Sequence, residues 1–268
     1  MVTTGDTGKS SPGFGGFGSR QTVLAGSSAH VAALKIREKV LVIAGQLLEC
    51  DPEDLEIAGR EVRLKGAGEI KVTLAKVAKA SLGTTGFYLP QGIASPGLEV
   101  TEHVIINDMT YSNGSAVATV EVDIETGETT VLDFVISHDC GRAINPTLVE
   151  GQIMGGFAHG LGNALFERMI FNEDGEPLTT TLADYLLPTL DVVPWPHLIH
   201  VESPTPLNPL GAKGVGEAGV LPTAAAIVSA IEDALQPLGI RISHAPVQPQ
   251  DLLEKIAKAR KRREAALT

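Results

Sequence analysis

One stretch of nine residues constrains this chain more than any other: Gly211 to Gly219, which reads GAKGVGEAG. Four of the nine are glycine, and this density lets a backbone take positive φ angles and approach another molecule closely. An apolar, alanine-rich run over 220–235 follows, with Pro222 where the first turn of a helix tolerates proline. We therefore expect Glu217 to lie in a loop that leads into a helix N-terminus.

A carboxylate in that place has two interpretations. The helix dipole stabilises negative charge at a helix N-terminus, so we expect Glu217 to stay ionised unless it is buried. An ionised carboxylate beside a glycine-lined cleft is suited to act as a general base. On spacing alone, a helix-capping glutamate in a loop that is glycine-rich for packing reasons has about even weight, because short glycine patterns are weak signals.

The composition narrows the classes of function. The chain has 268 residues, 43% hydrophobic and 20% charged, which suits one large domain or two small lobes. A net charge of −11 argues against a nucleic-acid partner and against an anionic membrane surface. No apolar run reaches the roughly 18 residues that span a bilayer.

Two cysteines, Cys50 and Cys140, are the full set. Their spacing fits neither a four-cysteine iron–sulfur cluster nor a zinc finger, so we expect neither of these two sites in this chain. Two distant cysteines also fit a reducing compartment, and we expect a cytoplasmic protein.

A segment rich in glycine, serine and threonine, residues 5–28, runs into a long helical pattern from about Ser27 to Leu48. A loop of this kind before a helix suits phosphate or another anion. It is not a P-loop, because the Gly8-Lys9-Ser10 triplet lacks the upstream glycine and position 3 is Thr3. A nucleotide site here is a weaker hypothesis, and a flexible loop is another.

The next residues predict a supporting block and then a hairpin. We expect strands at 55–58, 62–64 and 70–72 and a helix over 73–80 capped by Thr73. Strands over 115–124 and 129–137 form the hairpin, which ends in His138-Asp139-Cys140. Chemistry often lies at strand ends, but three consecutive side chains point in different directions. Turn and packing roles are therefore favoured over a metal site.

A glycine-rich helix is predicted from about Thr147 to Phe166, begun by Asn145-Pro146. Each of its interior glycines costs about 1 kcal/mol relative to alanine, which a helix tolerates when something packs very close to it. Another helix or a ligand fits equally well; Gln152 would offer its amide to a ligand, and His159 lies on the same face. Beyond it we expect further strands over 168–201, a short strand over 240–243 and a charged helix over 250–268.

Three segments together resemble one family. They are Gly13 to Gly26, which contains GFGSRQT, then Asp139 to Gly162, DCGRAINP…EGQIMGGFAHGLG, and GAKGVGEAG. Their order and separations are similar to those in the molybdenum-binding subunit of the xanthine dehydrogenase, aldehyde oxidase and carbon monoxide dehydrogenase family. The resemblance covers about residues 2–256, and it is to the C-terminal half of that large subunit only.

The resemblance implies an α+β fold. Residues 1–268 would form one molybdopterin cofactor-binding domain of mixed antiparallel sheet and helices, with two possible lobes at about 1–110 and 111–268. A partner chain would carry the first half of the molybdenum subunit and complete the pocket. We expect such a half-pocket to be poorly soluble alone, with exposed apolar surface around residues 155–161.

The resemblance also assigns roles to individual residues. Glu217 corresponds to the catalytic base and Gln152 to a glutamine that hydrogen-bonds the cofactor. Further cofactor-binding positions fall in the N-terminal loop, Gly18, Ser19, Arg20, Gln21 and Thr22, and in the catalytic loop, Lys213, Gly214 and Gly216. The pterin holds the metal in this family, so no protein side chain is expected to ligate it.

The activity implied is oxidation of a small molecule, an aldehyde or an N-heterocycle, with water as the oxygen donor. The cofactor would be molybdenum–molybdopterin, with the cytosine dinucleotide form the usual bacterial choice. Electrons would leave through [2Fe-2S] clusters in an iron–sulfur subunit and FAD in another subunit. The alternative is a non-catalytic scaffold fragment that completes the cofactor pocket of a partner chain.

Overall fold

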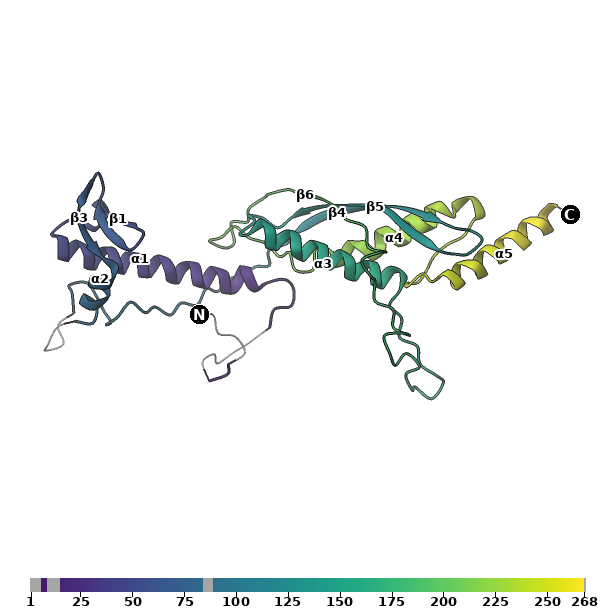
Figure 1. The fold of residues 1–268 in the computed structure, drawn as a ribbon, viewed down its shortest axis with the longest axis horizontal. Helices are drawn as coiled ribbons and strands as arrows, with labels where there is room; N and C mark the ends of the chain where they lie inside the picture. Colours follow the sequence, from purple (N-terminus) through teal and green to yellow (C-terminus); the bar gives the residue numbers. More distant parts are fainter. Residues whose placement is uncertain (1–5, 9–14, 84–88, 268) are drawn as a thin grey trace. The chain divides into compact units, whose positions relative to one another are not determined.

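The computed structural model describes residues 6–8, 15–83 and 89–267 (Figure 1). The chain divides into two compact units, one of Met1–Val23 with Asp108–Thr268 and one of Leu24–Asn107. The described residues up to Val23 therefore belong with the C-terminal part of the chain, and the smaller unit begins at Leu24.

The smaller unit is a helix packed on a three-stranded antiparallel sheet. Helix α1 spans Ser27–Leu48, and strands β1 (Leu55–Ala58), β2 (Glu61–Leu64) and β3 (Ala67–Thr73) pair in that order. Helix α2 (Leu74–Ala80) begins where Oγ1 of Thr73 accepts a hydrogen bond from the Lys76 N–H at 3.2 Å. Ile43, Leu55 and Val62 are at most 1% exposed in its core. The expected helices, strands and Thr73 cap of this block are confirmed.

The larger unit is built on a mixed sheet of three strands. Strands β4 (Asn113–Val122) and β5 (Thr129–Asp139) form the expected antiparallel hairpin, and β6 (His197–His200) pairs with β5 in parallel. The Oδ1 of Asp123 accepts the Glu125 N–H at 2.7 Å in the connecting turn, and Gly127 takes a φ of 77° there. The sheet places the C-terminal end of β5 beside the segment that follows β6.

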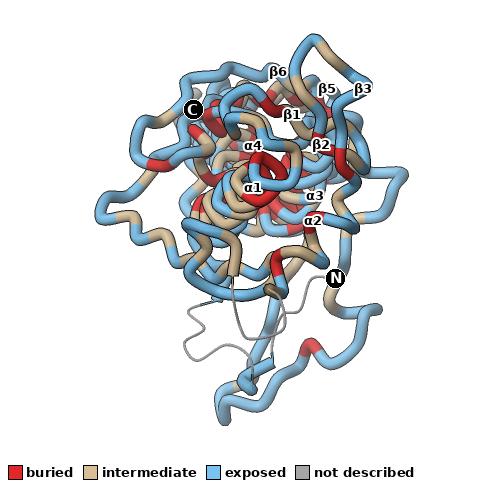
Figure 2. The backbone as a smooth tube through the Cα atoms, turned by 90° about the vertical axis from the view of Figure 1, so that its left-hand side faces the viewer, coloured by how far each residue is buried: buried red, intermediate tan, exposed pale blue. Residues whose placement is uncertain are grey.

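Three helices complete the larger unit: α3 (Pro146–Leu165), α4 (Val220–Ala234) and α5 (Pro249–Leu267). Helix α3 begins where Oδ1 of Asn145 accepts the Leu148 N–H, with Pro146 in its first turn. The core joins sheet to helix, and the rings of Phe134 and Phe157 lie 4.5 Å apart between centroids. Buried stretches follow the helices and strands, whereas the connecting loops are mostly exposed (Figure 2). The α+β class and the helices over 146–165, 220–234 and 249–267 are confirmed.

The expected strands between 168 and 201 are mostly absent from the described chain. Apart from β6, the segment holds one isolated bridge, between Phe171 and Pro177, which closes a turn at Asp174-Gly175. Residues 185–189, an apolar run within the segment 168–201, form no strand, and neither do residues 240–243, so a strand is wrongly expected at both places. Their apolar runs favour an extended backbone, but a strand also needs a neighbouring strand to pair its N–H and C=O groups.

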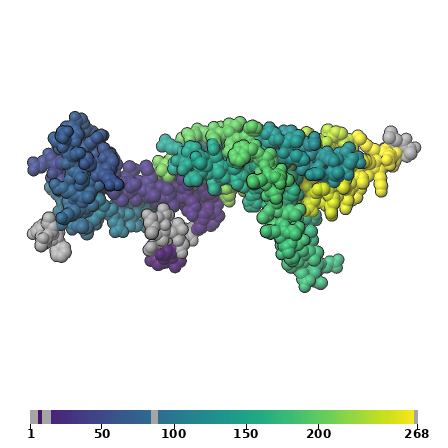
Figure 3. Space-filling model, viewed as in Figure 1, coloured from purple at the N-terminus to yellow at the C-terminus, as the bar shows by residue number. Residues whose placement is uncertain are grey.

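The segment 167–196 is instead an irregular arm that projects from the larger unit (Figure 3). Its large apolar side chains are exposed: Met169, Ile170, Phe171, Leu178, Leu182, Leu186, Leu187, Leu190 and Trp195. The expectation of exposed apolar surface around residues 155–161 is wrong, because Phe157 and Leu161 are fully buried under α4.

No helix in the described part of the chain has the length and apolar character that a bilayer crossing needs.

Candidate functional site

The loop over 211–219 is bound to the end of β5 through its backbone. The Lys213 N–H donates to the Cys140 carbonyl at 2.7 Å, and the Arg142 N–H donates to the Gly211 carbonyl at 2.9 Å. Gly141 has a φ of 67°, and a Cβ on it would lie 2.2 Å from the Gly211 oxygen. Because no side chain fits at that crossing, the loop approaches β5 at backbone distance.

Glu217 follows this crossing, in the last turn of chain before α4. Its N–H donates to the Oγ of Ser19 at 2.9 Å, and the same Oγ donates to the Oε2 of Glu217 at 2.9 Å. Its carbonyl accepts the Leu221 N–H at 3.2 Å, which joins the loop to the helix. Glu217 is an exposed residue, and Ser19 is hydrogen-bonded to its carboxylate.

Three glycine-rich segments meet around Ser19. A Cβ on Gly214 would lie 2.8 Å from the Ser19 Cβ, and one on Gly216 would lie 3.4 Å from the Ser19 Oγ. The same Gly216 position is 3.5 Å from the Oε1 of Gln152 on α3. The structure therefore brings together Ser19, Gln152, Gly214, Gly216 and Glu217, which come from all three motifs.

The other predicted residues of the N-terminal loop interact within the loop itself. The Arg20 Nε donates to the Gly15 carbonyl at 3.2 Å, and its guanidinium lies 4.0 Å over the Phe17 ring. The Gln21 side chain lies against Gly16.

Gly18 takes a φ of 67° with open space where its Cβ would be. Thr22 is exposed and begins a π-helical turn, Thr22–Gly26. The alternative nucleotide site at Lys9 and Ser10, and the start of the motif at Gly13, lie outside the described residues.

Two glycines of α3 are explained by helix packing, and two others face open space. A Cβ on Gly156 would lie 2.9 Å from the Gly219 Cα, and one on Gly160 would lie 2.6 Å from the Thr223 Cβ, so α4 accounts for both. Gly151 and Gly155 have nothing within 4 Å of the Cβ position. They flank the exposed Gln152, so bare backbone surrounds that amide on the outer face of the helix.

The polar residues at the end of β5 do not form a metal site. Among the described residues, no group of three or more His, Cys, Asp or Glu side chains is placed to hold a metal ion. His138 is 5% exposed and its Nε2 has no hydrogen-bond partner in the described chain; burial lowers its pKa. Burial likewise raises the pKa of the Cys140 thiol.

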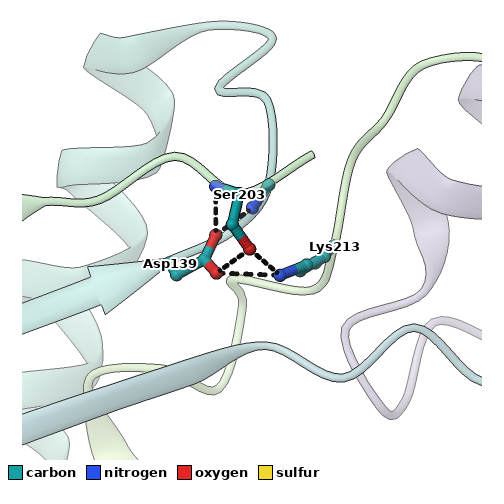
Figure 4. A network of polar contacts seen from close by, with 4 residues as sticks. Asp139, Ser203 and Lys213 are labelled. Carbon is teal, nitrogen blue, oxygen red and sulfur yellow. Dashed lines mark hydrogen bonds and ion pairs between the residues drawn. The ribbon is translucent and has the colours of Figure 1, made fainter. Parts of the chain in front are cut away.

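Asp139 instead forms a compact network with Lys213 and Ser203 (Figure 4). Its Oδ2 accepts the Lys213 Nζ at 2.8 Å and the Ser203 Oγ at 2.7 Å, while its Oδ1 accepts the N–H groups of Gly141 and Ser203. Burial alone would raise the pKa of Asp139, but the hydrogen bonds from Lys213, Ser203 and Gly141 outweigh it and hold the pKa well below its usual range. Sequence reasoning missed Ser203, which lies in a proline-rich connection.

The family follows from comparison with known proteins. A model described as the molybdopterin cofactor-binding domain matches residues 1–194. The chain belongs to the molybdopterin cofactor-binding domain family.

Relatives of this family member include two proteins of Paenarthrobacter nicotinovorans. The nicotine 6-hydroxylase large subunit is 37% identical over 97% of this chain, and the 6-hydroxypseudooxynicotine dehydrogenase complex subunit gamma is 38% identical over 91% of it. The chain spans only 31% and 30% of those two proteins.

Solved structures of the family have the same fold. The CO dehydrogenase of Oligotropha carboxidovorans superposes with a TM-score of 0.85 at 31% identity, over 98% of this chain and 32% of the other. Quinoline 2-oxidoreductase of Pseudomonas putida 86 gives 0.80 at 38% identity, over 92% of this chain and 31% of the other.

The residues present fit the cofactor that this family is named for. A pterin offers ring nitrogens and an amide-like edge, and it needs hydrogen-bond donors and acceptors at close range. Gln152 offers an exposed amide, and the bare backbone at Gly18, Gly151 and Gly155 leaves open space where side chains would otherwise stand. Nothing else in the described chain fills that space at these three positions.

Proposed function

We propose that this chain is one part of a molybdenum hydroxylase and that Glu217 is its general base. The reaction proposed is oxidation of an aldehyde or an N-heterocycle with water as the oxygen donor. The observation that carries the proposal is the meeting of three separate glycine-rich segments at Ser19, Gln152, Gly216 and Glu217. An exposed carboxylate at a point where three glycine-rich segments meet is suited to act as a base beside a bound cofactor.

Each group of this chain has a defined task in that reaction. The Oε2 of Glu217 is held by Ser19, so the Oε1, which has no hydrogen-bond partner among the described residues, is the atom that accepts the proton. Gln152 and the bare backbone beside it would hold the molybdopterin. The cofactor, when bound, supplies the metal centre that accepts two electrons from the substrate.

The rest of the complex belongs to other chains in this proposal. Since the chain spans less than a third of the two relatives, the remaining part of the pocket would come from a chain with the first half of the molybdenum subunit. An iron–sulfur subunit and an FAD subunit would take the electrons onward. We further propose the cytosine dinucleotide form of the cofactor and a cytoplasmic complex.

Substitution of Glu217 by Gln tests the proposal directly. The variant keeps the size and the Ser19 contact but cannot accept a proton, so turnover should fall by roughly 10²–10⁴-fold. Molybdenum per complex, measured on the chain co-expressed with its partner chains, should stay as in the parent. Glu254→Gln, at an exposed position of α5, is the control and should leave both quantities unchanged.

The same experiment distinguishes the proposed base from the alternative function, a non-catalytic scaffold for a partner's cofactor. A complex that holds molybdenum through this chain and turns over at a near-normal rate with Gln at 217 would reject the base and favour the scaffold. A complex without molybdenum would reject both.

A further inference from the structure

We propose that the Asp139–Lys213 ion pair, completed by Ser203, positions Glu217. The inference rests on the proposed function of Glu217 as a base. In it, Lys213 and Asp139 are positioning residues: they touch neither cofactor nor substrate and act only through the loop that carries Glu217. This differs from the role that the family resemblance implied for Lys213, which was to bind the cofactor.

The loop needs a device of this kind because of its own composition. Only Gly214, Val215 and Gly216 separate Lys213 from Glu217, and two of those three residues have no side chain to fix the backbone. Such a segment has many accessible conformations in isolation. A base, however, must be held close to one geometry, because a displacement of about 1 Å costs on the order of 100-fold in rate.

The ion pair fixes the N-terminal side of that segment. The side chains of Lys213 and Asp139 are 9% and 10% exposed, and the Nζ of Lys213 also donates to the Ser203 Oγ at 2.8 Å (Figure 4). The backbone bonds from Lys213 to Cys140 and from Arg142 to Gly211 lie directly beside it. Side chain and backbone together attach the loop to the end of β5.

Asn208 reinforces the same side of the loop. It is 7% exposed, its Nδ2 donates to the Ala212 carbonyl at 2.8 Å, and its Oδ1 accepts the N–H groups of Leu210 and Ala212. The backbone before Lys213 therefore has its N–H and C=O groups hydrogen-bonded at Leu210 and Ala212, and it is held in place where the glycine-rich segment begins.

The C-terminal side of the segment is fixed by different contacts. Glu217 is bonded to Ser19, and Gly219 lies so close to α3 that a Cβ on it would be 2.1 Å from the Ile153 oxygen. With both sides attached, the three residues between them have little freedom. Loss of the Lys213 attachment would leave the position of Glu217 to the Ser19 and α3 contacts alone.

The ion pair explains why the Lys213 ammonium group is not available to bind the cofactor. Both oxygens of Asp139 are already hydrogen-bonded, Oδ1 twice by backbone N–H groups and Oδ2 by Lys213 and Ser203. A buried carboxylate that loses its cation is left uncompensated, which is strongly unfavourable. Lys213 therefore remains with Asp139 when the cofactor binds.

The test uses the chain co-expressed with its partner chains and compares Lys213→Met with Lys213→Arg. Lys213→Met removes the charge, and kcat per molybdenum should fall by roughly 100-fold with KM and molybdenum content little changed. Lys213→Arg keeps the charge and should recover at least part of that loss. Lys258→Met, on the exposed face of α5, is the matched control and should leave kcat unchanged.

Amide hydrogen exchange of the resting complex gives a readout that needs no turnover. In Lys213→Met the peptide over 211–219 should exchange roughly tenfold faster or more, because the Lys213 and Glu217 N–H groups lose ordered acceptors, while peptides of α1 stay unchanged. This measurement tests whether Lys213 holds the loop even if Glu217→Gln turns over normally and Glu217 is rejected as the base.

Three outcomes would overturn the inference. One is unchanged exchange and unchanged kcat in Lys213→Met. The second is loss of molybdenum with a normal kcat per remaining molybdenum, which would make Lys213 a cofactor-binding residue. Where Lys213→Met does not assemble, Ser203→Ala removes the hydroxyl that bonds both Asp139 and Lys213 and should loosen the pair without removing either charge. Unchanged exchange over 211–219 in that variant is the third outcome.

Discussion

The hydroxyl of Ser19 and residue Glu217 form a reciprocal pair: the Oγ accepts the Glu217 N–H and donates to its Oε2, both at 2.9 Å. The two residues are 198 positions apart in sequence. Ser19 takes a left-handed φ of 56°, which residues other than glycine rarely adopt, and Gly18 before it has a φ of 67°. The N-terminal loop therefore accepts an unfavourable conformation that brings its hydroxyl to the candidate base.

Ser19→Ala removes this hydroxyl and keeps the backbone restriction. A hydrogen bond of this kind contributes about 1 kcal/mol net, so we expect kcat to fall roughly fivefold, since 1.4 kcal/mol corresponds to about tenfold. Exchange of the Glu217 amide should rise in the same variant. Ser243→Ala, at an exposed position in the same unit, is the control. Unchanged kcat and unchanged exchange would show that the pair does not hold Glu217.

Two adjacent glycines of α3 give opposite expectations. Alanine at 155 enters open space and adds helix propensity, so Gly155→Ala should stabilise the chain by up to about 1 kcal/mol. Alanine at 156 meets the backbone of Gly219 and Val220 at 2.9 Å, and overpacking of this kind costs about 1–3 kcal/mol. Thermal unfolding of the purified chain, followed by circular dichroism of its helices, measures both changes.

The same glycine pair also tests where the cofactor lies. If molybdopterin covers the bare backbone beside Gln152, Gly155→Ala should lower the molybdenum content of the complex although it stabilises the chain. Full molybdenum content in Gly155→Ala would instead assign the bare face to packing against a partner chain.

Local patterns in the sequence predicted the regular elements well. The apolar spacing of residues 27–48 predicted α1 to the residue, and Asn145-Pro146 predicted the start of α3. Both signals depend on neighbours within one turn of helix, which the sequence displays directly. The runs over 185–189 and 240–243 failed because a strand depends on a distant partner that such short runs do not specify.

The site shows the same division between local and distant information. Glu217 was placed correctly before a helix, because the glycine-rich loop and Pro222 are local signals. The partnership of Lys213 with Asp139 joins residues 74 positions apart, and Ser203 enters it from a third segment. No periodicity connects those segments, so the contacts of Lys213 could be seen only in the folded chain.

The exposed apolar arm over 167–196 leads to a prediction about assembly. Leu190 is 95% exposed and Leu182 is 72% exposed, whereas monomeric proteins seldom expose large apolar side chains in such numbers on one segment. We infer that the arm packs against the proposed partner chain with the first half of the molybdenum subunit, since the chain spans only 30% and 31% of the two relatives. Lysine at either position would then increase the solubility of the free chain and weaken its association with the partner chain.

The double variant Leu182→Lys/Leu190→Lys should therefore raise the soluble fraction of the chain expressed alone and reduce the amount of partner chain that co-purifies with it. Each buried leucine contributes about 1.5–3 kcal/mol, so loss of two should weaken association by at least tenfold. Thr180→Lys adds one positive charge at an exposed polar position of the same arm and should leave co-purification unchanged. Full co-purification with both lysines present would show that the partner binds another surface. Two lysines buried at the contact would lower the affinity, because burial of an unpaired charge is unfavourable.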